Sequence, residues 1–67
     1  MDVLRGDPHA AEVRLTRGEL GIINNALNEI CHGIEVPEFA TRIGAELAEV
    51  ERLLAEFGAL IRGRPTP

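Results

Sequence analysis

Apolar residues recur every three or four positions after Thr16, which is the spacing of one face of an α-helix. Thr16 and Glu19 are spaced as a capping box, in which each side chain accepts a hydrogen bond from the other residue's backbone amide. Gly33 is placed where a left-handed glycine commonly ends a helix. The pattern predicts a helix over about residues 16–32. The apolar stripe consists of Leu20, Ile23, Leu27, Ile30 and Ile34.

Two further helices are predicted in the second half of the chain. Proline has no backbone amide hydrogen and suits the first position of a helix, so Pro37 is expected to begin a short helix over about residues 37–43. Gly44 separates it from a longer helix over about residues 45–61. The third helix has a wide apolar stripe that consists of Leu47, Val50, Leu53, Leu54, Phe57, Leu60 and Ile61.

Both ends of the chain lack a helical period. Residues 1–11 mix glycine, proline and charged residues, so they are expected to form a flexible arm, followed by a short extended segment around Val13. Residues 63–67 contain two prolines and are expected to form a flexible tail. The expected domain is residues 12–62, and the expected fold class is all-α, with three helices after the extended segment.

The chain is short for a domain that folds alone. At 67 residues, a single core supplies only about 3–5 kcal/mol of stability. Cys31 is the only cysteine, so no disulfide within the chain adds to it. We therefore expect a homodimer formed mainly by the first and third helices. The expected self-association residues are Leu20, Ile23, Leu27, Leu47, Val50, Leu54, Phe57 and Ile61.

The charge of the chain disfavours DNA and membrane surfaces as partners. Eleven acidic residues stand against seven basic ones, which gives a net charge of −4. A negative chain is repelled by phosphates and by anionic lipids. No apolar run approaches the roughly 20 residues of a membrane span, and the N-terminus lacks a signal-peptide pattern. With a single thiol typical of a reducing compartment, the expected location is cytoplasmic.

Residues 39–53 contain the spacing of a tight helical corner. A small residue, a glycine four positions later and a branched apolar residue six positions beyond it occur at Ala40, Gly44 and Val50. In this spacing the segment resembles the helix-turn-helix unit of bacterial regulators, which implies a dimer that binds DNA. The second helix of this unit exposes mostly glutamates, whereas base edges and phosphates are read by hydrogen-bond donors, so a protein partner is favoured.

Three short stretches carry a second resemblance. They read LTRGEL at residues 15–20, NALNEI at residues 25–30 and PEFATRIG at residues 37–44. In this LTR-x-EL, NALNEI and PEF-x-TRIG pattern the chain resembles small bacterial proteins, of an actinobacterial type, whose function is unassigned. The resemblance implies no particular activity.

Polar residues form a line along the first long helix, with Asn24, Asn28 and His32 each four positions apart. Glu29 and His32 have the chemistry of an acid/base pair or of two metal ligands. No nucleophile, second carboxylate or glycine-rich loop accompanies them, which favours a solvated face. Asparagine beside an apolar stripe can also fix the register of two helices at an interface, so an interface role for these residues remains an alternative.

These patterns predict a non-enzymatic, self-associating protein-interaction module that acts as a regulator or inhibitor of a partner protein. A helix-turn-helix transcriptional regulator that binds DNA as a dimer is the alternative. No cofactor or metal is expected, because the soft ligands Cys31, His9 and His32 are too few for a structural metal site. The expected partner-facing residues are Glu46, Glu49, Arg52, Glu56, Asn24 and Asn28.

Overall fold

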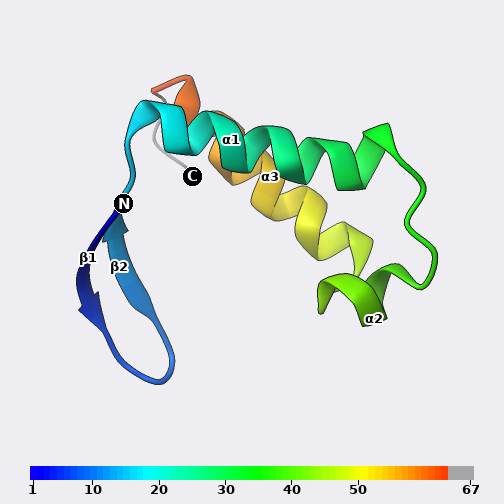
Figure 1. The fold of residues 1–67 in the computed structure, drawn as a ribbon, viewed down its shortest axis with the longest axis horizontal. Helices are drawn as coiled ribbons and strands as arrows, with labels where there is room; N and C mark the ends of the chain where they lie inside the picture. The colour runs from blue at the N-terminus through cyan, green and yellow to red at the C-terminus, as the bar shows by residue number, and fades with distance from the viewer. Residues whose placement is uncertain (64–67) are drawn as a thin grey trace.

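The computed structural model of the chain describes residues 1–63, and Figure 1 shows its elements. Two strands come first and three helices follow, the first of which ends in a π-helical turn, η1. The elements are β1 (Asp2–Gly6), β2 (Ala11–Arg14), α1 (Arg17–Asn28), η1 (Glu29–Gly33), α2 (Phe39–Ile43) and α3 (Leu47–Ile61). The predicted tail over residues 63–67 lies outside the described residues, apart from Gly63.

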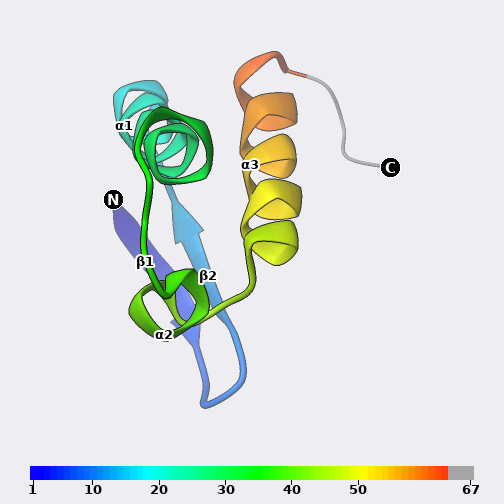
Figure 2. The same ribbon diagram turned by 90° about the vertical axis from the view of Figure 1, so that its right-hand side faces the viewer.

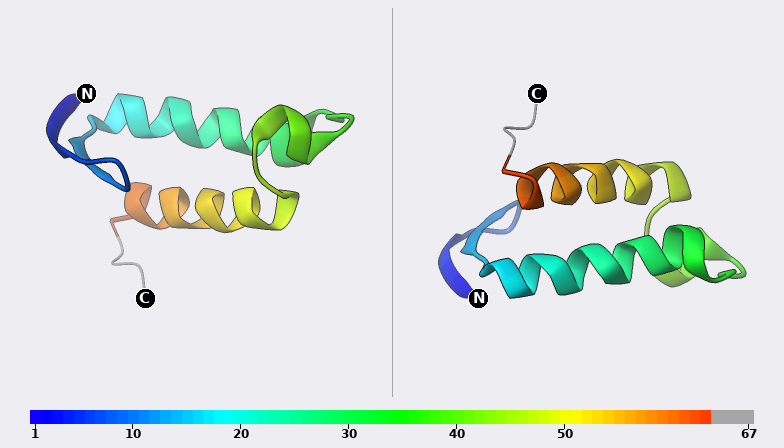
Figure 3. Two further views of the ribbon diagram at one scale, coloured as in Figure 1. Left: turned by 90° about the horizontal axis from the view of Figure 1, so that it is seen from below. Right: turned by 90° about the horizontal axis from the view of Figure 1, so that it is seen from above.

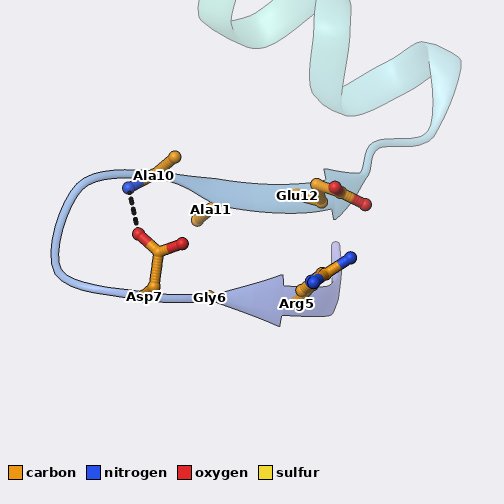
Figure 4. Close-up of a pocket in the computed structure, with 6 residues that line it drawn as sticks. All are labelled: Arg5, Gly6, Asp7, Ala10, Ala11 and Glu12. Atoms are coloured by element: carbon orange, nitrogen blue, oxygen red, sulfur yellow. Dashed lines mark hydrogen bonds between the residues drawn. The ribbon is translucent and has the colours of Figure 1, made fainter.

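The prediction of an all-α fold is wrong, because residues 2–14 form a two-stranded antiparallel hairpin. Its turn is built by Asp7, whose Oδ1 accepts hydrogen bonds from the backbone amides of His9 (2.8 Å) and Ala10 (2.9 Å). Figure 4 shows the second of these bonds. Pro8 follows Asp7, and aspartate then proline is a favoured start of a tight turn. Residues 1–11, which were predicted to be a flexible arm, therefore contain β1, the turn and the first residue of β2.

The register of the hairpin separates its charged residues from its valines. Val3 lies opposite Val13, whereas the flanking pairs bring opposite charges together, Asp2 with Arg14 and Arg5 with Glu12. A bulge between Val3 and Arg5 keeps both charged pairs on one face. The other face is apolar.

The capping box predicted at the start of α1 is confirmed. The backbone amide of Glu19 donates to Thr16 Oγ1 at 3.1 Å, and the amide of Thr16 donates to Glu19 Oε1 at 2.9 Å. The prediction of a left-handed Gly33 is wrong: the last turn is π-helical, and Ile34 ends the helix with a φ of −131°. The helix nevertheless continues through η1, so its extent is close to the predicted one.

Replacing Thr16 with alanine is expected to lower the free energy of unfolding by about 1 kcal/mol, because the hydrogen bond from the Glu19 amide to Thr16 Oγ1 is lost. Urea denaturation followed by the helical circular dichroism signal measures this change. Thr41→Ala, at an exposed position of α2, is the matched control and is expected to change stability by less than about 0.5 kcal/mol. Equal effects of the two substitutions would show that the cap contributes nothing specific.

The second and third helices begin later than predicted. Pro37 does not begin a helix; α2 starts at Phe39, after Glu38, which has a left-handed φ of 52°. The third helix starts at Leu47, because the amide of Glu46 donates to Glu49 Oε1 (3.3 Å) in a capping interaction at Glu46. The turn between these helices therefore needs more residues than a single glycine.

Gly44 ends α2 in the left-handed region, with a φ of 87°, and an added Cβ would meet no neighbour there. Gly44→Ala is therefore expected to cost about 1–2 kcal/mol from backbone conformation alone. Gly21→Ala is a matched contrast, since Gly21 lies inside α1 with open space around it, and it is expected to stabilise by about 0.5–1 kcal/mol. Urea denaturation of both variants tests the opposite signs, and a shared sign would refute this account of Gly44.

The helices α1 and α3 lie side by side and run in opposite directions, as the two views of Figure 3 show. Arg17 at the start of α1 joins them, since its Nη1 donates to the backbone oxygens of Leu60 (3.1 Å) and Ile61 (2.9 Å). The carbonyl of Leu60 also accepts from the backbone amide of Gly63 at 3.0 Å. The guanidinium therefore adds a side-chain cap to the C-terminal end of a neighbouring helix. Figure 1 shows the hairpin and α2 at opposite ends of this pair, and Figure 2, which looks along α1, shows both of them on the same side of that helix.

Candidate functional site

The hydrophobic core of the chain is very small. Among residues 1–63, Val50 is the one buried apolar residue, with 5% of its surface exposed. The chain exposes 5352 Å², about 1,200 Å² more than a compact monomer of this length. Its radius of gyration of 13.1 Å is that of a compact domain of about 100 residues. The helices therefore leave apolar surface that the chain does not cover itself.

The least exposed positions of α1 and α3 mark the faces that the two helices turn toward each other. On α1 these faces centre on Leu20 and Leu27, and on α3 they centre on Val50, Leu54 and Phe57. These five residues were predicted to form an interface between copies, and the structure places them mainly within one chain. The other three predicted residues lie at the margins, with Ile23 half-buried and Leu47 and Ile61 exposed.

One side of the helix pair is polar. His32 Nε2 of η1 lies 3.9 Å from Glu51 Oε2 of α3, so the line of Asn24, Asn28 and His32 borders the side where Glu51 lies. We call these four residues the polar edge. Cys31 sits nearby, where partial burial, with a smaller contribution from Glu51, raises the pKa of its thiol.

The opposite side of the helix pair is apolar. At 100° per residue, Ile23 and Ile30 lie across the contact face of α1 from Asn24 and Cys31. Leu53 and Leu60 occupy the corresponding side of α3, and they are 44% and 48% exposed. We call Ile23, Ile30, Leu53 and Leu60 the apolar edge. Each pair is seven residues apart, the repeat that places side chains in line along a helix that packs on another.

The hairpin and α2 stand on the side of the apolar edge. Met1 and Leu15, at the base of the hairpin, line a hollow of about 210 Å³ together with Ile22 and Ile23. This hollow places the hairpin beside the Ile23 end of the apolar edge. Figure 1 shows the hairpin and α2 projecting in the same direction from opposite ends of α1. The apolar edge therefore lies on the side of the helix pair toward which both the hairpin and α2 project.

The base of the hairpin is also held by charge. The terminal ammonium group of Met1 bonds Glu19 Oε2, while Glu19 Oε1 accepts from the backbone amide of Thr16. The ammonium group, followed by the Thr16 amide, holds the pKa of the Glu19 carboxyl below its usual range. Glu19 therefore serves the helix cap and the hairpin at the same time.

The predicted partner-facing residues of α3 divide into two groups. Glu46 and Glu49 form the helix cap described above, so the Glu49 carboxylate is already engaged. Arg52 and Glu56 are exposed and line a shallow hollow of about 320 Å³ beside Leu53. The remaining predicted residues, Asn24 and Asn28, belong to the polar edge.

The corner that resembles a helix-turn-helix unit consists of α2, the turn at Gly44 and α3. Ala40 is half-buried, Gly44 has the positive φ that the turn needs, and Val50 is the buried core residue. The packing and the turn of this corner therefore explain the spacing of Ala40, Gly44 and Val50 in the sequence. Its exposed surface carries Glu56 beside Arg52, as the sequence indicated.

The predicted pair of Glu29 and His32 is not brought together. His32 faces Glu51, while the Glu29 carboxyl group lies against Gly33 of its own helix, where an added Cβ would come within 2.5 Å of Glu29 Cδ. In residues 1–63, no three histidine, cysteine or acidic side chains converge as a metal site. Over the same range, no helix is both long and apolar enough to cross a bilayer.

Leu53 and Leu60 were predicted only as members of the wide apolar stripe of the third helix, and no interface role was predicted for Ile30 or for the hairpin valines. The seven-residue spacing of Leu53 and Leu60 was the available signal, but a helical wheel does not say which part of a wide stripe its own chain covers. The function of these surfaces must be inferred from the chain itself, because no protein-family model, curated protein or solved structure matches it.

Proposed function

We propose that this chain is a non-enzymatic protein-interaction module that self-associates, with a second copy covering the apolar edge. The observation that carries the proposal is the near-absence of a core: Val50 alone is buried in residues 1–63, while Leu53 and Leu60 stay about half exposed. Leucine pairs in this position stabilise a protein only when another apolar surface covers them.

The exposed area supports a second copy as the occupant. One partner in a stable protein complex buries about 800 Å². The chain exposes about 1,200 Å² more total surface, polar and apolar together, than a compact monomer, and this excess is of the size that one partner buries. The apolar edge of Ile23, Ile30, Leu53 and Leu60 carries no charge and extends along both helices, so it suits a two-fold arrangement in which the same patch meets itself. Two helix pairs joined in this way form a four-helix bundle.

Sedimentation velocity of the full chain tests the proposal. We expect a species with twice the mass of one chain at micromolar concentration, and unfolding transitions that move to higher urea as protein concentration rises. A folded monomer over the same concentration range would refute self-association.

A DNA mobility-shift assay at increasing salt tests the alternative of a helix-turn-helix regulator. DNA binding through phosphates must weaken steeply as salt rises. We expect no shift even at low salt, because the net charge is −4 and α3 exposes Glu56 beside Arg52. A salt-sensitive shift would favour the regulator and contradict the role proposed here.

A further inference from the structure

The N-terminal hairpin is an amphipathic element without a partner in its own chain. Val3 is 69% exposed and Val13 40% exposed, although the two lie opposite each other on the apolar face. Leu4 at the bulge is also exposed. A two-stranded hairpin that is solvated on both faces is at most marginally stable. The valines lie on one face of the hairpin and the charged residues on the other, which is the pattern of an antiparallel sheet that packs one face against another part of a protein.

The chain cannot cover this face with its own helices. The hairpin stands beyond the end of the α1–α3 pair, and its strands pack mainly on each other. It contacts the helices at its base, where Met1 and Leu15 meet Ile22 and Ile23. Figure 3 shows the strands extending past the first turn of α1 rather than lying along it.

A second copy that covers the apolar edge would lie on the side toward which the hairpin projects. The hollow between Met1, Leu15 and Ile23 joins the hairpin to the apolar edge without a charged gap other than Glu19 at its margin. Any bundle formed through Ile23, Ile30, Leu53 and Leu60 therefore brings the helices of the second copy beside the hairpin of the first. The exposed apolar side chains of the hairpin, Val3, Leu4 and Val13, are part of the surface by which the chain exceeds a compact monomer.

We propose that the hairpin is an interface arm, whose apolar face of Val3 and Val13 packs on the helices of a second copy of this chain. This inference rests on the proposed self-association and adds to it the hairpin as a second element that contacts the other copy. By two-fold symmetry each copy gives its hairpin to the other. The charged pairs Asp2–Arg14 and Arg5–Glu12 then face solvent.

Isotope-filtered NMR on the full chain tests the contact directly. Carbon-13-labelled and unlabelled chains are mixed, unfolded and refolded together, so that labelled chains pair with unlabelled ones. We expect cross-peaks from the methyl groups of Val3 and Val13 to side chains of the unlabelled copy. A dimer that shows no such cross-peaks, or shows only strand-to-strand contacts between two hairpins, would overturn the arm while leaving self-association intact. A monomer would overturn both.

Val3→Glu tests the same contact by affinity. Two copies of the valine are lost from each dimer, so we expect the dissociation constant to rise at least about tenfold. His9→Glu is the matched control, because it adds the same side chain at the exposed turn of the same hairpin, and it should leave the dissociation constant within about twofold. An unchanged dissociation constant for Val3→Glu, with helical content preserved, would contradict the arm.

Discussion

The double variant Leu53→Glu with Leu60→Glu is expected to sediment with the mass of a single chain. Both leucines are about half exposed on the apolar edge, so each glutamate is tolerated in the monomer but not between two copies. Burying one leucine contributes about 1.5–3 kcal/mol, and each dimer loses four of them. We expect the dissociation constant to rise by at least about 100-fold.

The matched control for this variant is Ala55→Glu. Ala55 is exposed on the same helix, and at 100° per residue it lies on the far side from Leu53 and Leu60. The control adds the same side chain to α3 without touching the apolar edge, so its mass should equal that of the wild type. If the double variant also kept the mass of the wild type, the apolar edge would not be the interface.

Val50→Asp is expected to abolish the helical circular dichroism signal. Val50 is 5% exposed between α1 and α3, and a carboxylate placed there has no cationic neighbour in the core. Burying an unpaired ionised carboxylate costs more than the stability of about 3–5 kcal/mol that a core of this size supplies. Val50→Ala removes two methyl groups and is expected to cost about 2 kcal/mol while keeping the fold.

Ala48→Asp is the control for the charge at Val50. It places the same side chain at an exposed position of the same helix, so the helical signal should persist. Thermal unfolding followed at 222 nm distinguishes the variants. A folded Val50→Asp protein with stability like that of Ala48→Asp would show that the α1–α3 contact is not the core of the chain.

The contrast between these two experiments follows from the position of the residues around α3. Val50 and Leu53 are neighbours in the same apolar stripe and look equivalent in sequence. In the structure Val50 is 5% exposed, whereas Leu53 is 44% exposed. A charge at Val50 therefore acts on folding, and a charge at Leu53 acts on association.

Local features of the fold were predictable because their causes lie within a few residues. The capping box of Thr16 and Glu19 needs only the spacing of two side chains, and it was predicted correctly. A glycine at a helix end does not by itself fix a left-handed backbone: Gly44 adopts one, whereas Gly33, for which it was predicted, does not. The helix starts at Phe39 and Leu47 are displaced from the predicted ones. Glu38 before α2 has a left-handed backbone and no side-chain cap, whereas Glu46 before α3 forms a capping box with Glu49.

The hairpin was missed because strand pairing is not a local property. Its strands are short, and the bulge between Val3 and Arg5 interrupts the alternation that would identify β1. Only the pairing of Val3 with Val13 shows that this segment has an apolar face. The bulge places Asp2 and Arg5 on one face of β1 and Val3 on the other, and the same extra residue breaks the alternation of polar and apolar residues in the sequence.

The sequence by itself determined that this chain consists of amphipathic helices with more apolar surface than a small domain can bury, because periodicity and length suffice for that. Tertiary structure alone decided how this surface is divided. The antiparallel packing of α1 on α3 covers Val50, Leu54 and Phe57 and leaves Leu53 and Leu60 open. The apolar stripe of one helix does not indicate which part of it a neighbouring helix will cover. The way in which two helices pack determines which apolar residues stay exposed for contact with another chain.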